Sequence, residues 1–251
     1  MKKSTKIIIG AVTAVALAGA GITAGYIIKT KNLKAYCPEG FTVTAHTGCE
    51  GTQDNSLEAI KKGAAAGADI VEFDLNFTEN GEAVLAHDKA EKDSVTLSEA
   101  FKTVAEYDEL KVNVDCKTVE NLKAVTELAE QYGILDRIFY TGIEAKDVET
   151  VKRDTPQVSY YLNKDIDKLK KNDETYIREL ISEVKALGAV GLNISYKSVS
   201  KKMVDFFHSE GLLVSVWTVN SELAMHKISA LGCDNITTRQ PSQLIEIIER
   251  N

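Results

Sequence analysis

Residues 44–88 decide the fold and read TAHTGCEGTQDNSLEAIKKGAAAGADIVEFDLNFTENGEAVLAHD. Two histidines in this stretch, His46 and His87, lie on either side of an acidic pair, Glu72 and Asp74. The two carboxylates alternate with apolar residues, so on a β-strand both point to the same face. Such a pair costs desolvation and mutual repulsion unless a cation lies between the two groups. The stretch therefore predicts a cation site flanked by two imidazoles, a combination suited to displacement at phosphorus.

From residue 41 onward the chain alternates strand and helix signals. Apolar, β-type runs lie near residues 41–46, 69–76, 111–116, 137–141, 157–162, 190–195, 212–219 and 234–237. Polar stretches with a helical period follow them, near residues 55–67, 97–107, 119–132, 144–153, 174–187, 199–209, 221–231 and 241–249. Eight strand–helix pairs with short links predict an α/β fold, a parallel (β/α)8 TIM barrel. We expect one catalytic domain over residues 41–251, a size that such barrels commonly reach.

Residues 1–31 predict a hydrophobic helix ahead of the barrel. Residues 7–28 carry no charge and have lysines on both sides. As a helix this run is ~33 Å long, enough to cross a hydrocarbon core of ~30 Å. Two interpretations stay open, an uncleaved membrane anchor or a signal peptide cleaved near the small residues 18–20. Either way we expect an extracytoplasmic protein, anchored in the cell membrane or secreted, with residues 32–40 as a linker.

The charge balance narrows the choice of partner. Residues 1–31 hold five of the 30 basic residues and none of the 37 acidic ones, which leaves residues 32–251 with a net charge of −12. This surplus of acids argues against nucleic acid or anionic lipid as the bulk partner. We expect a small-molecule substrate instead, and an anionic one would need a local positive site.

In a parallel barrel the reactive side chains gather at the C-terminal ends of the strands. Ionisable and aromatic residues fall at these ends in the first, second, third and seventh expected strands: His46, Glu72, Asp74, Asp115, Lys117 and Trp217. Three carboxylates without a paired Cys or His spacing favour a hard divalent cation, Ca²⁺ or Mg²⁺, over zinc. The alternative is that the carboxylates form ion pairs with lysines inside the barrel.

The order of these motifs resembles the glycerophosphodiester phosphodiesterase family. The family's His-Arg-Gly, Glu-Asn-Thr and Gly-Ala-Asp-x-x-Glu-x-Asp correspond here to HTG at 46–48, DNS at 54–56 and GADIVEFD at 67–74. Its Thr-x-Asp-Gly…His-Asp corresponds to residues 78–88. Later segments extend the resemblance over residues 41–250: VDCK at 114–117, VWTVN at 216–220 and GCDNI at 232–236.

The resemblance implies hydrolysis of a glycerophosphodiester to sn-glycerol 3-phosphate and an alcohol. It implies that His46 and His87 are the general acid and base, without saying which is which. For Glu72, Asp74 and Asp115 it implies a role as ligands of the divalent cation.

The resemblance also suggests substrate-binding residues. Lys117 is expected to reach a phosphate oxygen or to balance the carboxylates. For Trp217, the resemblance implies a place in the pocket, against the glycerol or the head group. The alternatives are an ion pair inside the barrel for Lys117 and a core position for Trp217.

Two positions depart from the family's pattern. Thr47 stands where the family has arginine, and offers substrate one hydroxyl and no charge. Arg239, late in the eighth expected strand, could supply a charge from across the barrel mouth. Asp54 replaces a glutamate, or caps the helix that begins at Asn55.

Two other functions remain open at this point. The first is a phospholipase D-like lipid enzyme of the sphingomyelinase D type. It is compatible with the short segment after His87, where an insertion of the family is nearly absent. The second is a degenerate barrel that binds a polar ligand without turnover, and Thr47 and Asp54 are its only support.

Overall fold

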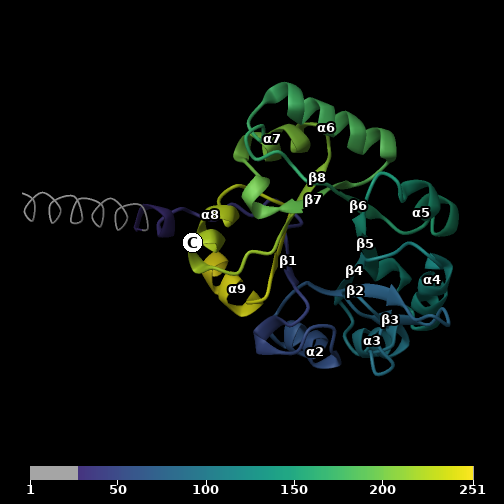
Figure 1. The fold of residues 1–251 in the computed structure, drawn as a ribbon. Coiled ribbons are helices and arrows are strands. Elements are labelled where there is room, and N and C mark those ends of the chain that lie inside the picture. The colour runs from purple at the N-terminus through teal and green to yellow at the C-terminus, as the bar shows by residue number, and fades with distance from the viewer. Residues whose placement is uncertain (1–27, 251) are drawn as a thin grey trace, which may run out of the picture.

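The computed structural model describes residues 28–250, and these form the expected barrel (Figure 1). The parallel strands are β1 (Thr42–Ala45), β2 (Ile70–Phe77), β4 (Lys111–Cys116), β5 (Ile138–Ile143), β6 (Tyr160–Asn163), β7 (Gly191–Ser195), β8 (Leu213–Trp217) and β9 (Asn235–Thr238). β1 pairs with both β2 and β9, which closes the sheet. A further short strand, β3 (Ala83–Leu85), runs antiparallel to β2.

Helices surround the strands in Figure 1 and cover the outer face of the barrel. They are α2 (Leu57–Ala65), α3 (Leu97–Val104), α4 (Leu122–Gln131), α5 (Val148–Asp154), α6 (Glu174–Leu187), α7 (Lys201–Ser209), α8 (Glu222–Ser229) and α9 (Pro241–Glu249). Short 3-10 turns are η1 (Cys49–Gly51), η2 (Leu135–Arg137) and η3 (Tyr196–Ser198). Two of these helices begin at side-chain caps: Thr96 caps α3 in a capping box, and Ser221 caps α8.

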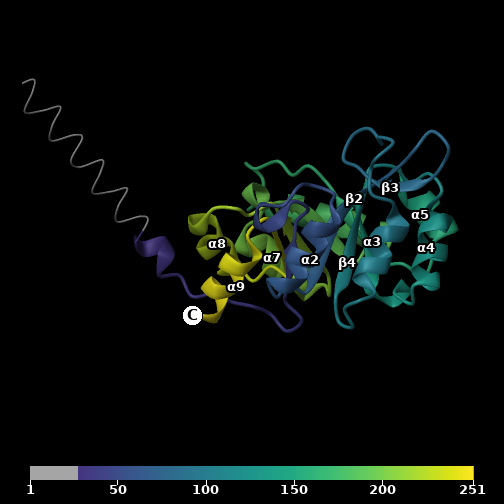
Figure 2. The same ribbon diagram turned by 90° about the horizontal axis from the view of Figure 1, so that it is seen from below.

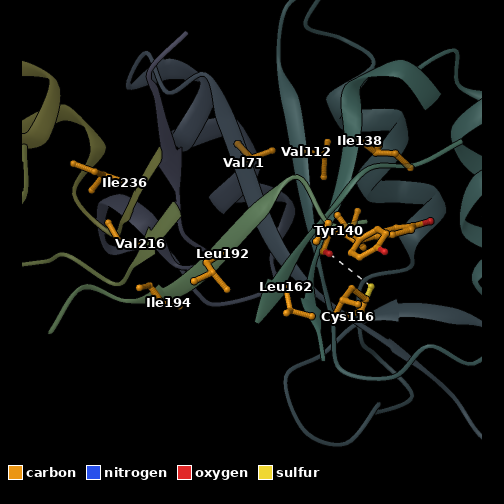
Figure 3. Close-up of a cluster of buried hydrophobic side chains, with 14 of the residues drawn as sticks. Val71, Val112, Cys116, Ile138, Tyr140, Leu162, Leu192, Ile194, Val216 and Ile236 are labelled. Atoms are coloured by element: carbon orange, nitrogen blue, oxygen red, sulfur yellow. Dashed lines mark hydrogen bonds between the residues drawn. The ribbon is translucent and has the colours of Figure 1, made fainter. Parts of the chain in front are cut away.

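Alternation along each strand separates two environments. One set of side chains packs outward against the helices and forms the apolar core, as Val71, Val112, Tyr140, Leu192 and Val216 do in Figure 3. Each of these side chains is at most 1% exposed. The core therefore lies between the barrel wall and the ring of helices. Cys116 is buried in this layer, because it alternates with Asp115 and Lys117 along the strand.

The alternate set faces the lumen, and near the middle of the barrel it is polar. In register, Glu72 lies beside Asn113 and Asn193 beside Ser215. The Ser215 hydroxyl donates to Asn193 Oδ1 at 2.9 Å, and Asn235 Nδ2 donates to Thr44 Oγ1 at 2.6 Å. Buried polar groups keep their free energy low only when they are paired in this way. The inside of the barrel below the strand ends is thus filled by hydrogen-bonded polar side chains.

The chain enters the barrel along α8. Lys31 Nζ lies 2.6 Å from Glu222 Oε1, and Tyr36 N donates to Ser229 O at 2.8 Å. The hydrophobic run expected over residues 7–28 lies, but for its last residue, outside the described part of the chain. Within residues 28–250, no helix has the length and apolar character needed to cross a bilayer.

Two aspartates fasten neighbouring strands at the N-terminal end of the barrel. Asp69, just before β2, accepts from Val43 N of β1 at 2.8 Å. Asp234, just before β9, accepts from Val214 N of β8 at 2.7 Å and lies 2.9 Å from His208 Nε2. The Gly-x-Asp sequences at these positions therefore stabilise the barrel at the end opposite the expected site.

Removing one of these carboxylates should destabilise the fold. In Asp234→Ala the N–H of the fully buried Val214 loses its acceptor, which we expect to cost about 1–3 kcal/mol in the free energy of unfolding. Asp205→Ala, which removes an exposed carboxylate from α7, is the matched control and should cost less than about 0.5 kcal/mol. Urea unfolding of the full chain measures both variants. Equal losses would contradict the role given to Asp234.

Candidate active site

A cavity of about 510 Å³ opens at the C-terminal ends of the strands. In Figure 2 the barrel is seen from the side, with loops around β2 and β3 rising beyond the strands. The cavity is lined by all the residues predicted for the site, together with Asp54 and Arg239: His46, Thr47, Glu72, Asp74, His87, Asp115, Lys117 and Trp217. The barrel thus brings together side chains that are up to 193 positions apart in the sequence, from His46 to Arg239.

Three carboxylates form the floor of the cavity. Glu72, Asp74 and Asp115 each offer an oxygen, and these oxygens lie within 4.8 Å of one another. Glu72 and Asp74 are buried, and Asp115 is partly buried. Their strands are neighbours, and Asp74 and Asp115 are in register. This spacing allows one hard cation to contact all three side chains.

Hydrogen bonds fix the orientation of each carboxylate. Thr47 N donates to Glu72 Oε2 at 2.9 Å. Asn55 bonds Asp74 twice, with Nδ2 donating to Asp74 Oδ2 at 2.8 Å and Asn55 Oδ1 accepting from Asp74 N at 3.0 Å. Supporting bonds of this kind orient metal ligands.

The third carboxylate is held by a residue that the sequence analysis missed. The Thr141 hydroxyl lies 2.6 Å from Asp115 Oδ1 and 2.8 Å from Asn113 Oδ1. Thr141 stands late in β5, so the rule that active residues gather at strand ends could have found it. Asn55 was missed as a contact of Asp74 because no sequence pattern links the two.

Lys117 balances the carboxylates. Its Nζ lies 2.8 Å from Asp74 Oδ1 and 2.5 Å from Asp115 Oδ2. Burial works against the ammonium group, but the charge of Asp115 and the hydrogen bonds to Asp115 and Asp74 outweigh it and raise the pKa of Lys117. Of the two roles expected for Lys117, this geometry supports the balancing one.

One lysine does not neutralise the whole cluster. Burial, followed by the charges of Asp115 and Asp74, raises the pKa of Glu72 well above its usual range, although Thr47 N–H and Lys117 act in the opposite direction. A divalent cation would supply the missing positive charge, and an all-oxygen donor set suits Ca²⁺ or Mg²⁺. The residues present therefore fit a divalent cation.

The two histidines stand in different surroundings. His46 Nδ1 donates to the Thr47 carbonyl at 2.8 Å, which leaves Nε2 with its lone pair when the ring is neutral. Burial lowers the pKa of His46, and the charge of Arg239 acts in the same direction, while the Thr47 carbonyl and the nearby aspartates oppose it. His87 lies at the exposed rim, with Nδ1 2.9 Å from Asp88 Oδ1.

The structure also rules out two alternatives that the sequence left open for neighbouring side chains. Asp54 does not cap the helix at Asn55. Ser56 is the cap of α2 and accepts from Ala59 N at 3.1 Å, because its backbone is extended and its hydroxyl points along the first turn. Trp217 is 40% exposed in the cavity, so the core position considered for it is wrong.

Comparisons with known proteins agree with this geometry. The sequence model of the "glycerophosphoryl diester phosphodiesterase family" matches residues 42–177 and 95–243. A glycerophosphodiester phosphodiesterase of Bacillus altitudinis is 26% identical over 240 residues, which cover 82% of this chain and 98% of that relative.

Two solved structures share the fold. A glycerophosphodiester phosphodiesterase of Parabacteroides distasonis superposes with a TM-score of 0.69 at 19% identity, over 86% of this chain and 98% of that one. A phosphodiesterase of Oleispira antarctica, in complex with its product sn-glycerol 3-phosphate, gives a TM-score of 0.70 at 19% identity, over 83% and 96% of the two chains. With the family's sequence model matched over most of its length, this chain belongs to the glycerophosphoryl diester phosphodiesterase family and is a hydrolase of phosphoric diesters.

Proposed function

We propose that the chain hydrolyses small glycerophosphodiesters to sn-glycerol 3-phosphate and an alcohol. The observation that carries this proposal is the convergence of two imidazoles and three carboxylates on one open cavity. Trp217 adds a half-exposed aromatic face at the same cavity, suited to the glycerol or the head group. The family's name and the product held by the Oleispira antarctica structure support the choice of substrate.

Glu72, Asp74 and Asp115 would hold a divalent cation, Ca²⁺ or Mg²⁺. When bound, the cation offsets the negative charge of the phosphodiester and polarises a phosphoryl oxygen. The ammonium group of Lys117 contacts both Asp74 and Asp115 and offsets part of their negative charge.

His46 is proposed as the general base and His87 as the general acid. The lowered pKa of His46 favours its neutral form, and its Nε2 can take the proton of a water molecule or of the substrate's neighbouring hydroxyl. The oxygen so released forms a bond to phosphorus, and the bond from phosphorus to the alcohol oxygen breaks. His87 gives a proton to that leaving oxygen. A neighbouring hydroxyl as nucleophile gives a cyclic phosphate first, which water then opens.

The alternatives fare differently. A non-catalytic barrel rested on Thr47 and Asp54, and both have defined partners beside an intact set of histidines and carboxylates. A phospholipase D-like activity on lysophospholipids keeps the support of the short segment between β3 and α3. An N-terminal membrane anchor and an extracytoplasmic location stay proposals that rest on residues 7–28.

A turnover assay tests the function directly. The full chain should release glycerol 3-phosphate from deacylated glycerophosphodiesters, lose this activity in chelator, and regain it with Ca²⁺ or Mg²⁺. Faster turnover of lysophospholipids would favour the lipid enzyme. Full activity after exhaustive dialysis against chelator would contradict the metal.

Metal binding should release a proton from the cluster. The raised pKa of Glu72 means that this side chain carries a proton in the metal-free state well above its usual range, and a cation must displace it. Metal affinity should therefore rise with pH until Glu72 is ionised on its own. Calorimetry in two buffers of different ionisation enthalpy measures the released proton.

Glu72→Gln tests this coupling, because glutamine cannot titrate. It should lose the proton release and weaken metal binding by ~10-fold or more. Glu183→Gln, a carboxylate paired with Lys164 away from the cavity lining, is the control and should keep both. A proton release that persists in Glu72→Gln would assign it to another group.

The histidine roles can be separated by the leaving group. His46→Ala and His87→Ala should each lower kcat on a natural diester by ~10²-fold or more, and the double variant should be little worse. A p-nitrophenyl ester needs no protonation of its leaving group. His87→Ala should therefore recover much of its rate on that ester, and His46→Ala should not. His226→Ala, in α8, is the control, and rescue of His46→Ala instead would exchange the two roles.

A further inference from the structure

An ion pair at the cavity mouth has no part in the mechanism above. Arg239, just after β9, meets Asp54, just before α2, through two parallel contacts of 2.7 Å (Nη1 to Oδ1) and 3.0 Å (Nη2 to Oδ2). Both residues line the cavity. Figure 1 shows α2 and α9 next to each other, where the barrel closes. The pair therefore spans the closure of the barrel directly above the site.

The backbone around Arg239 is fixed on both sides. Arg239 N donates to Asn220 Oδ1 at 2.8 Å, and Glu50 N donates to Arg239 O at 2.8 Å. Gly48 packs against the ion pair, since a Cβ there would lie 1.9 Å from Asp54 Oδ1 and 2.7 Å from Arg239 Nη1. Gly48 also has a φ of 70°, which glycine adopts without strain. The turn after His46 is thus shaped to admit the guanidinium.

The other cations of the cavity are committed elsewhere. Lys117 is held by Asp74 and Asp115 at the floor. Lys146 pairs with Glu144 at the rim, where its side chain is 73% exposed. A substrate phosphate that enters a cavity lined by this many carboxylates needs a positive group that still has unpaired N–H donors and is not fully hydrated.

Arg239 meets this requirement. A guanidinium has five N–H groups, and Asp54 takes two of them. In the described part of the chain, Asp54 is the side chain that pairs with the Arg239 guanidinium. Three N–H groups of that guanidinium therefore remain for a ligand. Its side chain is 38% exposed, which combines access from the cavity with partial desolvation. Arginine binds phosphate oxygens in the same forked manner as carboxylates.

We infer that Arg239 binds the phosphate of the substrate and that Asp54 is its positioning residue. The inference rests on the proposed function for the identity of the substrate, but the ligand chemistry that it requires is only a phosphate mono- or diester. Asp54 holds one edge of the guanidinium, and the other edge faces the phosphate. The Thr47 hydroxyl accepts a hydrogen bond from Asn55 N at 2.5 Å and carries no charge, so Arg239 is the residue that binds the phosphate.

Binding of sn-glycerol 3-phosphate to the metal-loaded full chain tests the inference without turnover. Arg239→Gln should weaken this binding by ~10-fold or more, as expected for the loss of a charge-assisted contact. Arg239→Lys keeps the charge but not the fork and should fall in between. Arg178→Gln is the control, because Arg178 also pairs with a carboxylate, that of Glu174 on α6, and does not line the cavity.

Kinetics then separate positioning from structure. Arg239→Gln should raise KM far more than it lowers kcat, and Asp54→Asn should raise KM by a smaller factor, ~3-fold to 10-fold, without changing Tm by more than Arg178→Gln does. Unchanged glycerol 3-phosphate affinity in Arg239→Gln would reduce the pair to a structural contact.

A measurement on the unmodified chain covers variants that do not fold. Phenylglyoxal labelling of Arg239, followed by mass spectrometry, should slow when inorganic phosphate or glycerol 3-phosphate is present, and labelling of Arg178 should not. Equal labelling of Arg239 with and without ligand would overturn the inference. Absence of turnover on every glycerophosphodiester, with phosphate protection intact, would instead overturn the proposed function and leave the anion site standing.

Discussion

Mutual repulsion of three carboxylates is the constraint on which the site depends. Carboxylate oxygens of Glu72, Asp74 and Asp115 lie within 4.8 Å of one another in a largely buried setting, where like charges raise the free energy of the folded state. Lys117 relieves part of this cost, and the raised pKa of Glu72 shows that part of it remains. The strand ends therefore carry an excess of negative charge, and under the proposed function a divalent cation would offset it and allow an anionic substrate to bind.

The barrel can hold such a cluster because its two faces are chemically distinct. Outward side chains are apolar and supply the burial that stabilises the fold, while the lumen beneath the site is a network of hydroxyl and amide groups. This separation follows from the period of two in a strand, which is visible in the sequence. For this reason the strands, the helices and the convergence of Glu72, Asp74, Asp115 and Lys117 could all be predicted before the structure.

Contacts between loops could not be predicted in the same way. Asp54 and Arg239 are 185 positions apart, and no period or motif joins them. Asn55 was recognised as part of a motif. Its two hydrogen bonds to Asp74, however, depend on how the loop before α2 folds back over β2. The cap of α2 also depends on the loop backbone: Asn55 has a φ of 56°, so the helix cannot begin there, and Ser56 is its cap.

The two departures from the family pattern are best understood as one rearrangement. Thr47 is 3% exposed, and its hydroxyl accepts from Asn55 N, which places the Asn55 amide against Asp74. An arginine at position 47 has no hydroxyl to accept from Asn55 N. The guanidinium of Arg239, just after β9, lies at the cavity mouth and does not displace the carboxylates at the bottom of the cavity. The shorter Asp54 lies where it can bind that guanidinium. On the inference drawn above, Arg239 takes the place of the missing arginine at the phosphate, and the contacts that orient Glu72, Asp74 and Asp115 are kept.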